Sequence, residues 1–220
     1  MIHQIIFANA KPGMTISDFQ DYWINVHAEK YARKIQQILK YKVNRLSYIS
    51  ENERPTYHGM AEIWLFNEQT QLASLQSDEY IHGARENEPE WAAFWQSICL
   101  DTYSQNYLTC DTLPAVKCVI VCKRKGGIPL KVFRSQIESN VQNYMNLTEI
   151  RQAQLCLVKD TAYSFGETVC DAVIQLWFEE RSPLLKAVEG LKFRLAMDKL
   201  YRICKQKYLH RFIAEENIII

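Results

Sequence analysis

Aromatic and apolar positions recur with a helical period near the start of the chain. Phe19, Trp23 and His27 stand at i, i+4 and i+8, with Tyr22 and Val26 between them. On a 3.6-residue period these five positions form one stripe, from which the neighbouring Asp and Asn side chains point away. We therefore predict an amphipathic helix whose buried face carries a histidine.

Alternating and continuous apolar runs predict the other elements. The first half reads as strands over residues 2–9, 42–50, 60–66 and 98–108, with helices over 15–39 and 69–77. Thr15 or Ser17 caps the first of these helices, and Gly83 and Pro89 interrupt the region after the second. The second half reads as strands over 116–123, 149–158, 172–178 and 209–219, with helices from Pro129 onward and over 183–200.

The two halves repeat one order, β-α-β-β-α-β, which is the ferredoxin-like split motif. Residues 62–66 (EIWLF) correspond to residues 175–179 (QLWFE), 113 positions later. Internal repeats are strong fold indicators, so we predict an α+β protein made of tandem units, residues 1–112 and 113–220, with a linker near 110–115. Each sheet has helices on one face only. Packing the two sheets within one chain would give a pseudo-dimeric α/β barrel, and an open pair of sandwiched domains is the alternative.

Composition narrows the class of protein. The formal charge is +1, which gives no nucleic-acid footprint, and no apolar run reaches the ~20 residues that a membrane helix needs. The first residues lack the basic region of a signal peptide. The seven cysteines are scattered and contain no Cys-x-x-Cys pair, which is typical of buried thiols in a reducing compartment. We expect a cytoplasmic protein.

The stretch from Lys11 to Ala28, KPGMTISDFQDYWINVHA, resembles the signature of the EthD-like family in the dimeric α/β-barrel superfamily. Gly59–Phe66 is similar to the third strand of that family, and the resemblance covers residues 1–109. The second half keeps the layout but loses the signature, so it is interpreted as a degenerate copy. The resemblance implies a cavity between sheet and helices that holds small organic molecules. Relatives include polyketide cyclases, cofactor-free monooxygenases, decarboxylases, dehydratases and haem enzymes, and the fold alone does not choose among them.

His27 is the candidate general base, because the pKa of an imidazole lies near neutrality. The alternative is a buried structural histidine bound to a backbone carbonyl. Tyr22 or Tyr48 would donate a hydrogen bond to the substrate. The predicted substrate-binding side chains are aromatic or imidazole groups: Phe19, Trp23, Tyr48, Trp64 and His82. His82 belongs to the interrupted segment, which we expect to cover the cavity mouth as a lid.

The remaining polar candidates have simpler interpretations. We expect His3, near the terminus, to be exposed, although its strand face could meet the barrel interior. His58, in a turn, and Glu88 and Glu90, in a charge run, are expected to be solvated. The chain has no metal-ligand motif and no phosphate-binding glycine loop, so we expect no metal and no nucleotide cofactor. A haem group that is held by one axial histidine leaves no ligand spacing in the sequence, so haem binding stays an alternative.

These patterns lead to a first hypothesis of a small-molecule enzyme that uses acid–base chemistry in the first half. It would cyclise or dehydrate an aromatic or polyketide-like compound, with cofactor-free oxygenation as the next choice. The alternative is a non-catalytic ligand-binding or accessory protein with the same pocket, acting as a monomer or homodimer. The helix near 131–144 of the second half has no imidazole, so we expect a single site.

Overall fold

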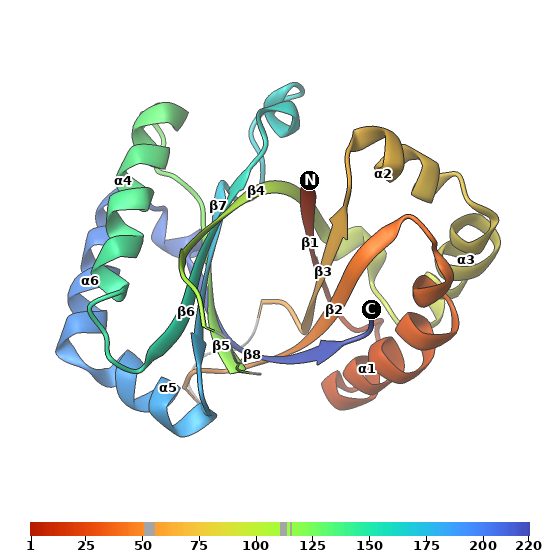
Figure 1. Ribbon diagram of the computed structural model, residues 1–220, viewed down its shortest axis with the longest axis horizontal. Helices are drawn as coiled ribbons and strands as arrows, with labels where there is room; N and C mark the ends of the chain where they lie inside the picture. Colours follow the sequence, from red (N-terminus) through yellow and green to blue (C-terminus); the bar gives the residue numbers. More distant parts are fainter. Residues whose placement is uncertain (51–55, 111–113, 115) are drawn as a thin grey trace. The chain divides into compact units, whose positions relative to one another are not determined.

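The computed structural model describes residues 1–50, 56–110, 114 and 116–220. Its eight strands follow the order β1-β3-β2-β8-β5-β7-β6-β4 in a closed barrel, which confirms the predicted α+β fold class (Figure 1). The strands are β1 (Ile2–Ala8), β2 (Ile38–Ser47), β3 (Gly59–Leu65), β4 (Ile98–Leu108), β5 (Val116–Cys122), β6 (Ile150–Val158), β7 (Ala172–Phe178) and β8 (His210–Ile218). The helices are α1 (Ile16–Tyr22), α2 (Glu68–Leu75), α3 (Arg85–Asn87), α4 (Leu130–Tyr144), α5 (Arg181–Glu189) and α6 (Leu191–Ile203). The predicted boundary between residues 112 and 113 lies outside the described residues and stays a prediction.

The chain forms two compact units. The first comprises Met1–Ser47, Pro55–Thr102 and Glu216–Ile220, and the second comprises Tyr48–Arg54 and Tyr103–Glu215. Strands β4 and β8 each contribute residues to both units. None of the helices in the described part of the chain is long and apolar enough to span a bilayer.

In the first unit, alternation along the strands separates an apolar sheet face from a polar one. Strand β1 pairs antiparallel with β3 and with β4, and β2 pairs with the other edge of β3. Ala61 and Leu65 of β3 belong to the hydrophobic core that includes Phe19 and Trp23 from the helical side. Successive side chains of a strand point to opposite faces, so Glu62, between Ala61 and the next core-facing position, points away from this core.

The first helix is shorter than its apolar stripe predicts. Thr15 caps α1 by accepting a hydrogen bond from the Asp18 backbone N–H at 3.1 Å. After Tyr22 the backbone widens into a π-helical segment, Trp23–Ala28, and a short 3₁₀ turn follows. Strand β2 begins at Ile38, four residues before the predicted start, because Ile38 pairs with Leu65 of β3. The prediction of a helix to Leu39 is therefore wrong beyond the π-helical segment.

A close backbone approach joins this helix to the sheet. A Cβ atom placed on Gly59 would lie 2.7 Å from Cζ3 of Trp23 and 3.1 Å from a ring carbon of Phe19. No side chain fits between β3 and the two rings, so glycine here allows the aromatic stripe to rest directly on the strand.

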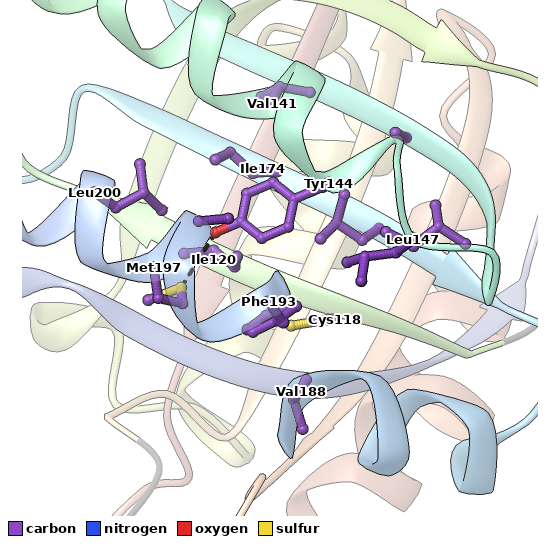
Figure 2. Packing of buried hydrophobic residues seen from close by; sticks show 14 of the residues in the cluster. Cys118, Ile120, Val141, Tyr144, Leu147, Ile174, Val188, Phe193, Met197 and Leu200 are labelled. Atoms are coloured by element: carbon purple, nitrogen blue, oxygen red, sulfur yellow. Dashed lines mark hydrogen bonds between the residues drawn. The ribbon is translucent and has the colours of Figure 1, made fainter. Parts of the chain in front are cut away.

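The second unit has an apolar core between its sheet and helices. Strand β5 pairs with β7 and β8, and β6 pairs with the other edge of β7. Figure 2 shows Tyr144 of α4 among apolar side chains from α6 and the sheet, with its hydroxyl donating to the Met197 sulfur at 3.3 Å. The predicted helix over 183–200 is two helices, because the backbone at Gly190 is extended and ends α5 there.

Candidate functional site

His27 lies on the buried face of the helical stripe, as its periodicity predicts. Phe19 is fully buried, Trp23 is 3% exposed and His27 is 6% exposed. His27 belongs to the π-helical segment Trp23–Ala28, and such local widenings of a helix occur frequently at functional sites. The sequence thus places a nearly buried imidazole against the core of the first unit.

A hydrogen-bonded chain fixes the orientation of this imidazole. The Nδ2 of Asn87 donates to the Tyr22 hydroxyl at 2.8 Å, which leaves the amide Oδ1 of Asn87 facing Nδ1 of His27 at 3.0 Å. An amide oxygen only accepts, so Nδ1 of the neutral ring carries the hydrogen and Nε2 carries the lone pair. None of the described residues gives Nε2 a hydrogen bond. The ring is therefore presented as an oriented proton acceptor.

Trp91 covers the site from the segment that follows the second helix. Its ring centroid lies 4.8 Å from that of His27 and 4.8 Å from that of Trp23. The backbone oxygen of Trp91 accepts from the Lys11 N–H at 3.0 Å, which ties this segment to the loop before α1. The indole is 1% exposed, yet its N–H has no acceptor among the described residues. A buried donor without a partner is unusual in a folded protein and calls for an explanation.

Burial dominates the electrostatics of the site. It lowers the pKa of His27 to about 4, despite the hydrogen bond to Asn87, which acts in the opposite direction. The same cause raises the pKa of the half-buried Glu88 to about 7, with Arg85 opposing it. Burial also raises the pKa of Tyr41, whose hydroxyl accepts from the indole N–H of Trp23 at 3.0 Å. At neutral pH the site thus holds an uncharged imidazole beside a carboxyl group whose pKa is raised.

The structure brings Phe19, Tyr22, Trp23 and His27 together, but it separates the other predicted site residues from them. Trp64 points to the opposite sheet face, where it stacks on His3 with ring centroids 4.2 Å apart. His82 lies on a second π-helical segment, Tyr80–Ala84, but its side chain is 69% exposed and contacts Glu86. Tyr48 is exposed and belongs to the second unit.

Three expectations about solvated residues are wrong. His3 is 3% exposed because its ring stacks on Trp64 and lies against Glu62. His58 is half-buried, and its Nδ1 accepts from the Ala10 N–H at 3.0 Å, so it secures the turn before β3. Glu88 is partly buried in the covering segment, whereas Glu90 is exposed as expected.

A buried polar cluster, which the sequence analysis missed, occupies the other face of the first unit's sheet. Nε2 of His3 lies 3.1 Å from the carboxylate of Glu62, which also accepts from Asn44 at 3.2 Å. Lys42 forms a second buried ion pair with Glu216.

In the second unit Lys117 occupies the position that corresponds to His3. Lys117 lies opposite Trp177 in the strand register, as His3 lies opposite Trp64. The Lys117 ammonium lies 4.8 Å from the centroid of the Trp177 ring.

The helix of the second unit that corresponds to the His27 stripe contributes only core. Phe133, Ile137, Val141 and Tyr144 are all fully buried and belong to the cluster around Tyr144 (Figure 2). Among the described residues, no group of three His, Cys, Asp or Glu side chains is placed to hold a metal ion.

The duplicated β-α-β-β-α-β order and the closed strand order define the dimeric α/β-barrel class, formed here by one chain. The EthD domain family model matches residues 11–94, which lie in the first part of the chain. The matched stretch contains His27, Asn87 and Trp91.

Solved structures share the fold over nearly the whole chain. An anthrone oxidase-like protein has a TM-score of 0.65 at 9% identity, with 98% of this chain and 90% of that chain covered. A candidate monooxygenase from Fusobacterium nucleatum subsp. nucleatum has a TM-score of 0.61 at 10% identity, covering 100% and 92%. A candidate chlorite dismutase has a TM-score of 0.51 at 9% identity, covering 98% and 94%. The TM-scores establish a shared fold, and identities this low establish no shared activity. None of the curated proteins matches the chain significantly.

Proposed function

We propose that the first unit is a small-molecule enzyme that transfers a proton on an aromatic or polyketide-like compound, with His27 as the base. The observation that carries this proposal is the hydrogen bond between Nδ1 of His27 and Asn87, which leaves Nε2 as an oriented acceptor. The buried N–H of Trp91, without an acceptor among the described residues, would hold the substrate oxygen. Tyr22 is a positioning residue in this scheme, because it acts on His27 through Asn87.

The proposed step starts from a carbonyl compound with an acidic C–H bond. Nε2 of His27 takes the proton, the electron pair of the C–H bond forms the new C=C bond, and the π pair of the C=O bond moves to oxygen, which becomes the enolate oxygen. The N–H of Trp91 would donate to that oxygen, as preorganised donors do in other enzymes. The pKa of His27 is low in the closed site, but an adjacent oxyanion raises it, because opposite charge favours the protonated ring.

The substrate needs access to side chains that are nearly buried. The segment Tyr80–Trp91, built from short π, α and 3₁₀ turns, covers His27 through Asn87 and Trp91. We propose that this segment is the lid and that it opens to admit the compound.

Haem binding has less support at this site. Phe19, Trp23 and Trp91 fill the space beside His27, so the residues present do not fit a haem group there.

We propose a reaction that begins with this proton transfer. Cyclisation, dehydration and cofactor-free oxygenation can all begin in that way, so the site supports this class of reactions and not one member of it.

We also propose a location and an assembly state. All seven cysteines are free thiols, which supports a reducing compartment such as the cytoplasm. The protein would act as a monomer or homodimer, and its binding partner would be the aromatic or polyketide-like compound.

Deuterium exchange tests the proposal without knowledge of the natural substrate. The probe is anthrone, whose methylene C–H bonds are acidic because the resulting anion is conjugated through the rings to the carbonyl oxygen, and NMR follows its exchange in deuterated buffer. The full chain should accelerate exchange, and His27→Gln should lower that acceleration by about 10²–10⁴. His82→Gln, at an exposed imidazole, is the matched control and should behave as the unchanged protein.

Two results would oppose the proposal. Equal acceleration by His27→Gln would remove His27 as the base. Saturable anthrone binding with no exchange, in a chain that retains His27, would instead support a ligand-binding or accessory protein.

A further inference from the structure

The second unit contains a groove that has no part in the proton-transfer site. It lies between α4 and α6, which run side by side (Figure 1). A hollow of about 520 Å³ occupies it, and its polar lining includes Ser135, Ser139, Asn140, Asn143, Lys199 and Arg202. We call this hollow the α4–α6 groove. Its volume lies within the usual range of small-molecule sites.

The two walls of the groove differ in chemistry. Helix α4 presents Asn140 and Asn143 at i and i+3, which places the two amides along one side of the helix. Helix α6 presents cations, and a neighbouring hollow of about 660 Å³ shares Asn143, Lys199 and Arg202 with the groove. Asp198 borders that second hollow, but no carboxylate lines the first.

Neither Lys199 nor Arg202 forms an ion pair with a described residue, and both side chains are exposed. The Lys199 ammonium donates to Oδ1 of Asn143 at 2.7 Å, and this uncharged partner leaves its charge in place. Arg202 forms no ion pair or hydrogen bond with a described residue. Two adjacent cations, one a forked guanidinium, match the charge of about −2 and the three acceptor oxygens of a phosphomonoester.

Asn140 gives an independent indication of a ligand. It is 3% exposed, and its Nδ2 donates to the backbone oxygen of Ala196 at 3.0 Å, which fixes the orientation of the amide. Its Oδ1 is then left buried without a donor among the described residues. A buried acceptor with no partner is costly, and a ligand hydroxyl in the groove would satisfy it once the side chains that cover Oδ1 move aside. Ser135 and Ser139, one turn apart, offer further hydroxyl groups beside it.

We propose that the α4–α6 groove binds a small phosphomonoester that carries hydroxyl groups, of the sugar phosphate kind. The phosphate lies between Lys199 and Arg202, and the hydroxyl groups reach Asn140 and Ser139. This site is formed by the second unit alone, so the proposal does not depend on the proton-transfer chemistry at His27.

Calorimetric titration of the full chain with glucose 6-phosphate tests the site. Glucose and inorganic phosphate are the two partial probes, and both should bind more weakly than glucose 6-phosphate. Arg202→Gln and Lys199→Gln should each weaken binding about tenfold or more, because each removes a charge-assisted contact. Arg194→Gln is the matched control: Arg194 is exposed on the same helix but lines a different hollow, so its loss should change affinity less than about twofold.

Added salt should weaken binding, since the contacts are near the surface. His27→Gln should bind glucose 6-phosphate as the unchanged protein does. Absence of saturable binding by glucose 6-phosphate would overturn the proposal. The proposal would also be overturned if Arg194→Gln weakened binding as much as Arg202→Gln and Lys199→Gln do. Equal affinity for inorganic phosphate and glucose 6-phosphate would overturn it too, because either result would indicate unspecific anion binding.

Discussion

Replacing His27 by Gln should change how the stability of the protein depends on pH. The pKa of His27 falls from 6.5 to about 4 on burial, so the unfolded chain takes up a proton at a higher pH than the folded chain. The stability associated with the neutral ring is complete above about pH 6.5 and is lost as the pH falls toward 4. Because one pKa unit corresponds to about 1.4 kcal/mol, the full loss is about 3 kcal/mol.

Most of this loss falls within an accessible range. Between about pH 7 and about pH 5 the His27 contribution decreases by about 2 kcal/mol. Glu88 acts in the opposite sense, because its raised pKa lets the folded chain take up a proton first as the pH falls below about 7. The unchanged protein should therefore show a shallow pH dependence, and Glu88→Gln should make the loss on acidification steeper.

Urea unfolding at several pH values measures both effects. His27→Gln should lose about 2 kcal/mol less than the unchanged protein over that range, whatever its stability at neutral pH. His82→Gln is the control, since its side chain is 69% exposed and should leave the pH dependence unchanged. Parallel pH profiles for His27→Gln and the unchanged protein would refute the claim that the buried ring is kept neutral.

Three further substitutions test the packing and the buried charges. Gly59→Ala should lower the free energy of unfolding by about 1–3 kcal/mol, because its Cβ would lie 2.7 Å from the Trp23 ring; a denaturant midpoint that does not move would contradict this close contact. Lys42→Met should cost about 3–5 kcal/mol by leaving Glu216 buried without its cation, and the double variant Lys42→Met with Glu216→Leu should regain most of it; additive losses would argue against the pair. Asp171→Asn should destabilise the second unit by a similar amount in thermal unfolding, since that fully buried carboxylate accepts from Lys123, Arg124 and Tyr163; an unchanged melting temperature would show that the network contributes little.

Periodicity predicted the parts of the site that lie on one element. The spacing of Phe19, Trp23 and His27 was sufficient to predict their common buried face, and the repeated Trp64 and Trp177 were sufficient to predict two matching units. These features follow from local geometry, since the 3.6-residue and two-residue periods fix which side chains share a face.

The contacts that orient the His27 ring could not be predicted in this way. Asn87 lies 60 residues away in a charge-rich segment, and only the fold brings its amide to Nδ1 of His27. His3 shows the same limitation: the position near the terminus suggested exposure, but Trp64 and Glu62 of β3 cover its side chain. Trp64 is apolar and strand-borne as predicted, yet alternation directs it to the sheet face opposite His27.

We propose that a substrate oxygen binds between His27 and Trp91 in the first unit. A crystal structure of the full chain with 1-naphthol, whose hydroxyl can both donate and accept, tests this placement. We expect the naphthol oxygen within hydrogen-bond distance of Nε2 of His27 and Nε1 of Trp91, with the segment Tyr80–Trp91 closed over it. Naphthol bound only beside Phe133 and Val141 of the second unit, with His27 and Trp91 packed as they are without it, would rule this binding mode out.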